Sequence, residues 1–249
     1  MTGGSAGIGL ATARLLLDEG AHVAICARDA DRLDEVAREL EEAQPGQVLA
    51  VPADVRDGAA VEVLVDRVVG RFGGIDGLVN NAGGSRMSTF ETTSDDDWRD
   101  ELDLKFSSIL HPVRAAGEHL ARSPQPAIVN VNAILARQPE PKLVATSAAR
   151  AGVLNLSRSL ATELAPIRVN SVCLGLIDTG QWRRRYEEAA IERTYEEWAG
   201  DLAAERGVLL GRLGTAEEVA TMIVLLLSPV SSFVTGSSLD IGGGVGRYV

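Results

Sequence analysis

The sequence predicts an α/β fold, a doubly wound parallel sheet with helices on both faces, and three observations support this. Short runs rich in β-branched residues alternate with longer segments of helical period, as in strand–helix–strand units with right-handed crossovers. Apolar residues make up 45% of the chain and 26 residues are glycine, which suits a sheet buried on both faces. The length of 249 residues fits one domain, residues 1–249, without a repeat or linker.

The expected elements alternate along the chain. The expected helices are Ile8–Glu19, Ala30–Ala43, Gly58–Phe72, Ser94–Ala121, Ser147–Leu164 and Ala216–Ser228. The expected strands are His22–Ala27, Gln47–Pro52, Gly77–Asn80, Ile128–Asn132, Ile167–Cys173 and Ser238–Ile241. Ser94 followed by Asp97 is a capping signal for the longest helix. Polar residues from about 180 to 211, called the insert below, interrupt the alternation.

The start of the chain lacks one element that this fold needs. In such a sheet a glycine-rich loop follows the first and most central strand, yet only Met1 precedes Thr2. Without that strand, His22–Ala27 and Gly77–Asn80 would keep unpaired ladder groups. We therefore expect a truncated central strand, with a gap or only a vestige at Met1 and Thr2, and further sequence upstream in the natural protein.

Charge and composition exclude several kinds of partner. The formal net charge is −11, whereas nucleic acid or an anionic membrane would need a basic face. The longest apolar run, near Met222–Leu227, is too short to span a bilayer. Cys26 and Cys173 lie in apolar runs and are expected as small buried side chains. The three histidines have no metal-ligand spacing, so we expect a cytoplasmic protein without a metal.

A glycine-rich loop precedes the first expected helix, with the sequence Thr-Gly-Gly-Ser-Ala-Gly-Ile-Gly from residue 2 to residue 9. Gly3 and Gly7 allow a tight turn and a close backbone approach, and free N–H groups at a helix start favour a pyrophosphate. An ordinary turn before a helix has the same sequence pattern, so the segments that follow must distinguish a nucleotide-binding loop from such a turn. These are Asp54-Val55, Asn80-Asn81-Ala82-Gly83 and the stretch from Ile167 to Thr179.

Together with residues 211–214 and 234–236, these segments resemble the short-chain dehydrogenase/reductase family over essentially the whole chain, and its ketoreductase-like branch in particular. The resemblance implies a Rossmann-type, dinucleotide-binding fold and oxidoreductase activity on a carbonyl or hydroxyl of a small molecule. It also implies a homodimer or homotetramer, because relatives pair the long helices, here 94–121 and 147–164. The cofactor-binding positions it implies are Gly3, Ser5, Gly7, Ile8, Gly9, Arg28, Asp54, Val55, Asn81, Ala82, Gly83, Arg150, Ile177 and Thr179.

The choice between NAD and NADP depends on the end of strand His22–Ala27. NAD-binding members of the family usually place an acid at the position of Ala27, where it accepts a hydrogen bond from the ribose 2′-hydroxyl. Ala27 cannot repel a 2′-phosphate, and Arg28 can bind one through its planar guanidinium. The alternative is a surface ion pair of Arg28 with Asp29 or Asp31. We predict NADP rather than NAD.

Four positions that carry catalysis in this family hold other residues here. The family's Tyr and Lys correspond to Thr146 and Arg150, its Ser to Ala133 and its helix Asn to Lys105. The Thr146 hydroxyl is shorter than a phenol and has no accessible ionised form, and loss of general acid catalysis costs about 10²–10⁴-fold in rate. Arg150 keeps the positive charge but cannot release a proton at neutral pH.

Lys105 is the residue that could compensate for these losses. Beside Arg150 its charged form would be disfavoured, which makes an amine an acid or nucleophile near neutral pH. The alternative is an ion pair with Glu101, four residues earlier on the same helix. Lys105, Thr146 and Arg150 are therefore the candidate catalytic residues.

The insert corresponds to the substrate lid of the family. Trp182 followed by three arginines, Arg183–Arg185, suggests a carboxylate- or phosphate-bearing substrate. The alternative is an amphipathic helix whose arginines pair with the glutamates that follow. Glu140 could be an acid, a partner of Arg150 or Lys105, or a solvated loop charge, and Tyr186 is the tyrosine that could reach the site.

Three functions stay open at this point. The first is an NADP-dependent oxidoreductase with a divergent active site. The second is a nucleotide-binding homologue without turnover, which regulates or assembles with an active relative. The third is a non-redox enzyme on the same fold that uses Lys105 for acid–base chemistry.

Overall fold

The computed structural model describes residues 1–189 and 192–246. The helices are α1 (Gly7–Asp18), α2 (Ala30–Ala43), α3 (Gly58–Phe72), α4 (Asp95–Leu120), α5 (Val144–Glu163), α6 (Gly180–Ala189), α7 (Tyr195–Glu205) and α8 (Ala216–Leu227), with short 3-10 helices η1 (Ile134–Ala136) and η2 (Pro229–Ser231). The strands are β1 (Val23–Ala27), β2 (Val48–Pro52), β3 (Gly77–Asn80), β4 (Ala127–Ala133), β5 (Arg168–Leu174) and β6 (Ser238–Ile241). Each predicted helix and strand is present, with ends shifted by at most three residues.

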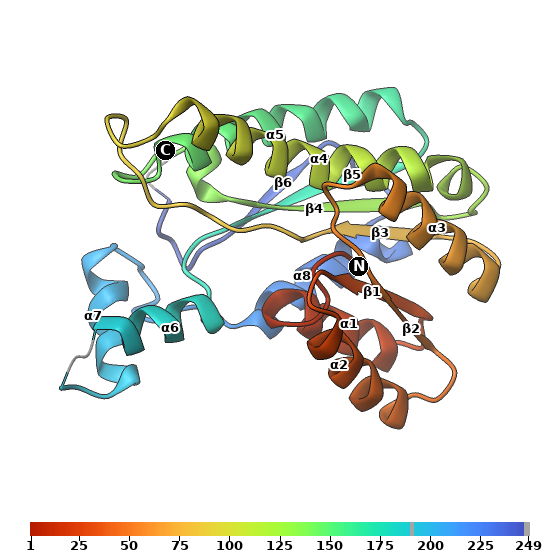
Figure 1. Cartoon of the computed structure of the whole chain (residues 1–249), viewed down its shortest axis with the longest axis horizontal. Helices are drawn as coiled ribbons and strands as arrows, with labels where there is room; N and C mark the ends of the chain where they lie inside the picture. The colour runs from red at the N-terminus through yellow and green to blue at the C-terminus, as the bar shows by residue number, and fades with distance from the viewer. Residues whose placement is uncertain (190–191, 247–249) are drawn as a thin grey trace.

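The strands are parallel and helices cover both faces, which confirms the predicted fold class. β1 pairs with β2, and the other four strands follow in the order β3-β4-β5-β6. Figure 1 shows α3, α4 and α5 on one face of the sheet and α1, α2 and α8 on the other. The register brings Asn80, Asn130 and Ser171 side by side across three strands.

The sheet is interrupted between β1 and β3, where the truncated central strand is predicted. Thr2 forms an isolated parallel bridge to Cys26, and its N–H donates to Val79 O at 3.0 Å. Cys26 N–H donates to Met1 O at 3.1 Å, and the Met1 ammonium donates to Ala24 O at 2.9 Å. Burial lowers the pKa of this ammonium. The predicted vestige at Met1 and Thr2 is confirmed.

A cavity of about 760 Å³ continues the line of this vestige. Its walls come from both sides of the interruption and are largely apolar, including Val23, Val61, Leu64, Leu78 and Val79. Within residues 1–189 and 192–246, no other segment pairs with the free edges of β1 and β3.

Capping explains most helix starts, and burial explains the one that the sequence placed wrongly. Ser94 Oγ accepts from Asp97 N–H and the Asp97 carboxylate accepts from Ser94 N–H, which confirms the capping signal. The predicted start of α5 at Ser147 is three residues late. No side chain caps this end, and the apolar residues Val144 and Ala145 extend the helix toward the core. Thr146 consequently lies in the first turn of α5.

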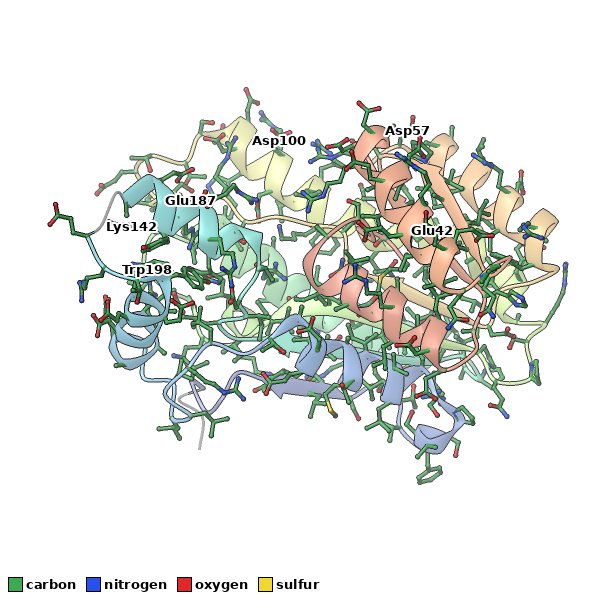
Figure 2. All side chains as sticks on the ribbon, turned by 90° about the horizontal axis from the view of Figure 1, so that it is seen from below. Glu42, Asp57, Asp100, Lys142, Glu187 and Trp198 are labelled. Atoms are coloured by element: carbon green, nitrogen blue, oxygen red, sulfur yellow. The ribbon has the colours of Figure 1, made fainter. Side chains whose placement is uncertain are left out.

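The insert folds into α6 and α7, which lie beyond the carboxyl end of β5 in Figure 1. An aromatic cluster joins the two helices, and Figure 2 shows Trp198 between them. The ring centroids of Trp182 and Trp198 are 6.3 Å apart, and those of Tyr186 and Tyr195 are 5.5 Å apart. In the part of the chain that the structure describes, no helix combines the length and apolar character needed to cross a membrane.

Candidate active site

A pocket of about 280 Å³ lies at the carboxyl ends of β3, β4 and β5. This crevice is where open α/β sheets bind their ligands. The helices contribute Ile8 from α1, Lys105 from α4 and Arg150 from α5. Residues that follow the strands complete much of the wall: Asn81, Ala82, Gly83, Gly84, Ser85, Ala133, Ile134, Gly175, Leu176, Ile177 and Thr179. Several predicted cofactor positions, among them Ile8, Asn81 and Thr179, therefore line the same pocket as the predicted catalytic residues Lys105 and Arg150.

The glycine-rich loop is held so tightly that three of its glycines, Gly3, Gly4 and Gly9, have no room for a side chain. A Cβ on Gly9 would lie 2.0 Å from Gly3 O, and one on Gly3 would lie 2.8 Å from Asn81 Nδ2. Gly3 and Gly7 also have φ angles of 64° and 49°, in the left-handed region. The loop can thus bring its backbone against a ligand.

The N-terminus of α1 has no side-chain cap. Its N-cap, Ala6, offers no hydrogen-bond acceptor on its side chain, whereas α2, α3, α4, α7 and α8 are each capped by an Asp, Ser or Thr side chain. The first-turn N–H groups of α1 therefore keep their capacity to bind an anion, and the helix dipole favours one there. A pyrophosphate fits this cradle.

Thr2 and Asn81 tie the glycine-rich loop to the segment after β3. Thr2 Oγ1 accepts from the N–H groups of Asn81 and Ala82, both at 2.9 Å. The Asn81 side-chain amide donates to Thr2 O at 3.0 Å and Gly3 O at 3.2 Å. The predicted site residue Asn81 thus shapes the cradle with its side chain.

At the far end of the cradle, Arg28 is exposed and makes no ion pair with any described residue. Asp29 instead accepts from the N–H of Arg32 as the N-cap of α2. The alternative pairing of Arg28 with Asp29 or Asp31 is therefore not formed. Arg32 Nε donates to Ser5 O at 3.2 Å, which places a second cation on the loop. Sequence analysis missed Arg32, although its place one turn after a capping Asp was a usable signal.

Asp54 and Val55, two of the predicted cofactor-binding residues, follow β2. Asp54 Oδ1 accepts from Arg56 N–H at 2.9 Å, and Val55 O lies 3.1 Å from His111 Nδ1. Both contacts fix the backbone of this turn, and the Val55 side chain is buried in the core. Neither residue lines the pocket of about 280 Å³.

Lys105 is buried in the pocket wall, with 5% of its surface exposed. Its Nζ lies 2.7 Å from Glu101 Oε1 and donates to Gly84 O at 2.6 Å. Burial lowers the pKa of Lys105, the positive charge of Arg150 lowers it further, and the Glu101 carboxylate opposes both effects. Lys105 therefore has both a lowered pKa and an ion pair with Glu101, the two alternatives that the sequence offered for it.

Thr146 is fully buried, and its Oγ1 donates to Glu101 Oε1 at 2.6 Å. The same carboxylate oxygen therefore accepts from both Thr146 and Lys105. The structure places the Thr146 hydroxyl behind Lys105, outside the residues that line the pocket. Glu101 is the member of this cluster that sequence analysis named only as an ion-pair partner.

Arg150 lines the pocket from the second turn of α5. One of its terminal nitrogens donates to Asn132 Oδ1 at 3.4 Å, while Asn132 Nδ2 donates to Arg150 O at 3.0 Å. Burial lowers the pKa of its guanidinium, and the charge of Glu101 opposes this. Its Nε is buried without a hydrogen-bond partner among the described residues, so a donor remains for a ligand. Beside it, Ala133 places no polar side-chain atom in the wall.

The expectation for Tyr186 is wrong, and two of the alternatives for Glu140, pairing with Arg150 or with Lys105, are not formed. Tyr186 does not reach the pocket, because its hydroxyl donates to Arg193 O and its ring packs against Tyr195 and Trp198. Glu140 lines the pocket but pairs with Arg206 rather than with Arg150 or Lys105. In both cases a partner within or beside the insert, which local sequence pattern does not identify, determines the orientation.

The three consecutive arginines of α6 have different surroundings. Arg183 pairs with Asp178 at 3.0 Å, and its guanidinium lies 4.3 Å from the centroid of the Tyr195 ring. Arg184 is exposed and does not line the pocket. The Arg185 side chain lies over the Trp182 ring, 4.6 Å from its centroid, and both residues line the pocket. Of the three arginines, the predicted anion contact is possible for Arg185.

Comparison with known proteins gives matches over nearly the whole chain. The family model for enoyl-(acyl carrier protein) reductases matches residues 3–246. A short-chain oxidoreductase from Pseudomonas aeruginosa PAO1, solved with NADPH and containing an atypical catalytic center, is 48% identical with a TM-score of 0.95, over 100% of this chain and 96% of that one.

Two further relatives differ in the small molecules named for them. L-sorbose reductase from Gluconobacter frateurii, solved with NADPH and L-sorbose, is 32% identical with a TM-score of 0.95, over 100% of this chain and 96% of that one. Cis-4-hydroxycyclohexanecarboxylate dehydrogenase from Sinomonas cyclohexanicum is 36% identical over 247 residues, or 98% of this chain and 94% of the relative. With these matches and the cradle described above, the chain belongs to the short-chain dehydrogenase/reductase family.

Proposed function

We propose that the protein is an NADP(H)-dependent oxidoreductase that acts on a carbonyl or hydroxyl group of a small molecule, with Lys105 as its proton donor. The observation that carries this is the position of Lys105, an amine with a lowered pKa in a pocket that Ile8 of the glycine-rich loop also lines. When bound, NADPH supplies the hydride. The related Pseudomonas and Gluconobacter enzymes were both solved with NADPH, which supports this cofactor.

The cradle suits NADP because of the two cations at its far end. Arg28 has an unpaired guanidinium at the end of β1, and Arg32 is hydrogen-bonded to the loop at Ser5. Both can approach a 2′-phosphate, for which Ala27 leaves room. Arg150, at the family's Lys position, lines the pocket and would donate from its guanidinium to a ribose hydroxyl.

In the direction of reduction, the carbonyl carbon accepts the hydride and the carbonyl oxygen takes a proton from the Lys105 ammonium. The products are an alcohol and a neutral amine, which solvent reprotonates. Burial and Arg150 favour this proton release, because both destabilise the charged lysine. Glu101 fixes Nζ through the 2.7 Å contact, and Thr146 fixes Glu101, so both are positioning residues.

The decisive experiment follows NADPH absorbance with a panel of carbonyl compounds, for the wild type and for Lys105→Met. We expect the variant to lose about 10²–10⁴-fold in turnover, the usual contribution of a general acid. Its NADPH affinity, measured by fluorescence titration, should change little. Full turnover by Lys105→Met would remove Lys105 as the acid.

NADPH binding without turnover of any compound by the wild type would favour the nucleotide-binding, non-catalytic alternative. A chemical conversion that consumes no NADPH would favour the non-redox alternative. Both outcomes contradict the oxidoreductase proposal while leaving the nucleotide cradle intact.

Two further properties belong to this proposal. The insert acts as a lid, since α6 and the segment after α7 contribute Trp182, Arg185 and Arg206 to the pocket. Copies of the chain assemble through the outer faces of α4 and α5 into a homodimer or homotetramer, and Leu102 of α4 is 40% exposed there. Light scattering coupled to size-exclusion chromatography tests the assembly, and a monomer would contradict it.

A further inference from the structure

The pocket carries positive charge in a protein that is negative overall. Among the described residues that line it, the charged ones are Lys105, Arg150, Arg185, Arg206 and a single carboxylate, Glu140. The whole chain has a formal net charge of −11. Even with Glu101 counted beside Lys105, cations outnumber carboxylates here by four to two. Such a local excess favours an anionic ligand.

Arg185 lies over the Trp182 ring without using its hydrogen-bond donors. Among the described residues it forms neither an ion pair nor a hydrogen bond, and its electrostatic attraction is to Glu188 on its own helix. Burial lowers the pKa of its guanidinium, and the nearby charge of Arg206 lowers it further. The ring therefore positions a planar cation whose N–H groups remain available.

Arg206, just after α7, faces the same space. It pairs with Glu140 through one terminal nitrogen, while its Nε is buried without a hydrogen-bond partner among the described residues. Two guanidinium groups that repel each other thus face one space, and its one lining carboxylate among the described residues, Glu140, pairs with Arg206. Arg183 on α6 is a useful contrast, because Asp178 and the Tyr195 ring already satisfy it. An anion placed between Arg185 and Arg206 would supply the missing acceptor and balance the charge.

We propose that Arg185 and Arg206 form an anion subsite that selects substrates with a carboxylate or phosphate group remote from the reacting carbon. This rests on the proposed function for the placement of the reacting carbon near Lys105. The Trp182 ring supplies an apolar surface beside the anion, so a ring or short apolar linker joins the two ends of such a substrate.

The test is a calorimetric titration of the NADP⁺-loaded protein, in which ketones cannot be reduced. The probes are 4-acetylbenzoate, its neutral methyl ester and 4-acetylphenyl phosphate. A hydrogen bond to a charged group contributes about 1.5–3 kcal/mol, which is roughly 10–100-fold in affinity. We expect the acid to bind at least about 10-fold more tightly than the ester.

Arg185→Gln and Arg206→Gln should each weaken binding of 4-acetylbenzoate by about 10-fold or more and leave the ester unchanged. Retained ester binding also shows that the variant pocket is folded. The matched control is Arg184→Gln, on the same helix but exposed and outside the pocket, which should alter neither affinity.

Tighter binding of the phosphate than of the carboxylate would support the subsite and assign it to phosphate-bearing substrates, and the reverse would assign it to carboxylates. Equal binding of acid and ester, equal losses of both in the variants, or no binding of either anion would overturn the proposal. Selective anion binding by a protein that reduces no ketone would leave the subsite standing and remove the oxidoreductase proposal.

Discussion

The nucleotide cradle and the cluster around Lys105 both reach the pocket, through Ile8 and through Lys105, but they are built from different parts of the chain. Gly3 and Gly9 shape the cradle through backbone contacts that leave no space for a Cβ. Lys105, Glu101 and Thr146 shape the cluster through side chains on α4 and α5. A substitution at one of these glycines forces the backbone of the loop to move. A substitution of a side chain on α4 or α5 leaves the helix backbone in place. This is a physical reason why the four positions that the resemblance assigns to catalysis can hold other residues while the cradle matches the family pattern.

The strongest test of this difference is Gly9→Ala. The added Cβ would meet Gly3 O at 2.0 Å, so the loop must move, and overpacking of this kind costs about 1–3 kcal/mol or more. NADPH affinity should fall by at least about 100-fold, because a shift of this size removes the anion contacts. Fluorescence titration measures the affinity and thermal unfolding measures the stability.

The matched control is Gly70→Ala, in the exposed last turns of α3, where a Cβ meets nothing within 4 Å. Alanine is the better helix former there, so the midpoint of unfolding should rise slightly and NADPH binding should not change. A Gly9→Ala protein that binds NADPH like the wild type would show that the cradle does not depend on these close backbone contacts.

The cluster should tolerate exchange more easily, and Thr146→Val tests this. The variant loses the 2.6 Å hydrogen bond to Glu101, which costs about 1.5–3 kcal/mol of stability for a bond to a charged group. NADPH affinity should stay the same because Thr146 does not line the pocket. Thr146→Ser keeps the hydroxyl and should retain most of the lost stability.

The pH profile shows whether Thr146 acts through Glu101. If Lys105 is the proton donor that we propose, reduction needs its ammonium form. The rate should then fall as the pH rises through the pKa of Lys105, which burial and Arg150 hold below the ordinary 10.5. Without the Thr146 hydroxyl, Glu101 Oε1 accepts a hydrogen bond from Lys105 alone. It then stabilises the ammonium form of Lys105 more strongly, which raises the pKa of Lys105. The pH at which the rate falls should therefore be higher in Thr146→Val than in the wild type. An unchanged pH profile would mean that Thr146 contributes only to packing.

Sequence pattern predicted the elements and the cradle well because both depend on local signals. The β-branched runs, the Ser94–Asp97 capping pair and the spacing of the glycine-rich loop lie within a few residues of one another. The interruption of the sheet at Met1 and Thr2 was predictable for a related reason: a parallel sheet of this kind has a fixed place for its first strand. The start of α5 was missed because no side chain caps it, and the burial of Ala145 and Thr146 extends the helix beyond Ser147.

The parts of the site that were missed depend on contacts between distant segments. Glu140 and Arg206 are 66 residues apart, and Thr146 and Glu101 are 45 residues apart, so no local pattern pairs them. Tyr186 has an apolar ring and a polar end that suit either a pocket or an aromatic cluster. Its contacts with Tyr195 and Trp198, on the following helix, place the Tyr186 ring in the aromatic cluster rather than in the pocket. Side-chain placement in a site therefore needs the fold, even where the residues themselves stand out.

The smallest effect is expected at the exposed edge of the cradle, where Arg28→Ala should weaken NADPH binding by roughly fivefold. The effect is modest because solvent screens a charge at this position and Arg32 remains on the loop. NADH affinity should not change, since NADH lacks the 2′-phosphate, and the loss for NADPH should shrink as salt is added. The control is Arg38→Ala, an exposed arginine of α2 whose Nε donates to Asp34 O instead. Equal losses for NADH and NADPH would mean that Arg28 supports the cradle as a whole. A loss confined to NADPH would show that cofactor choice, unlike cofactor binding, rests on a side chain that can be exchanged.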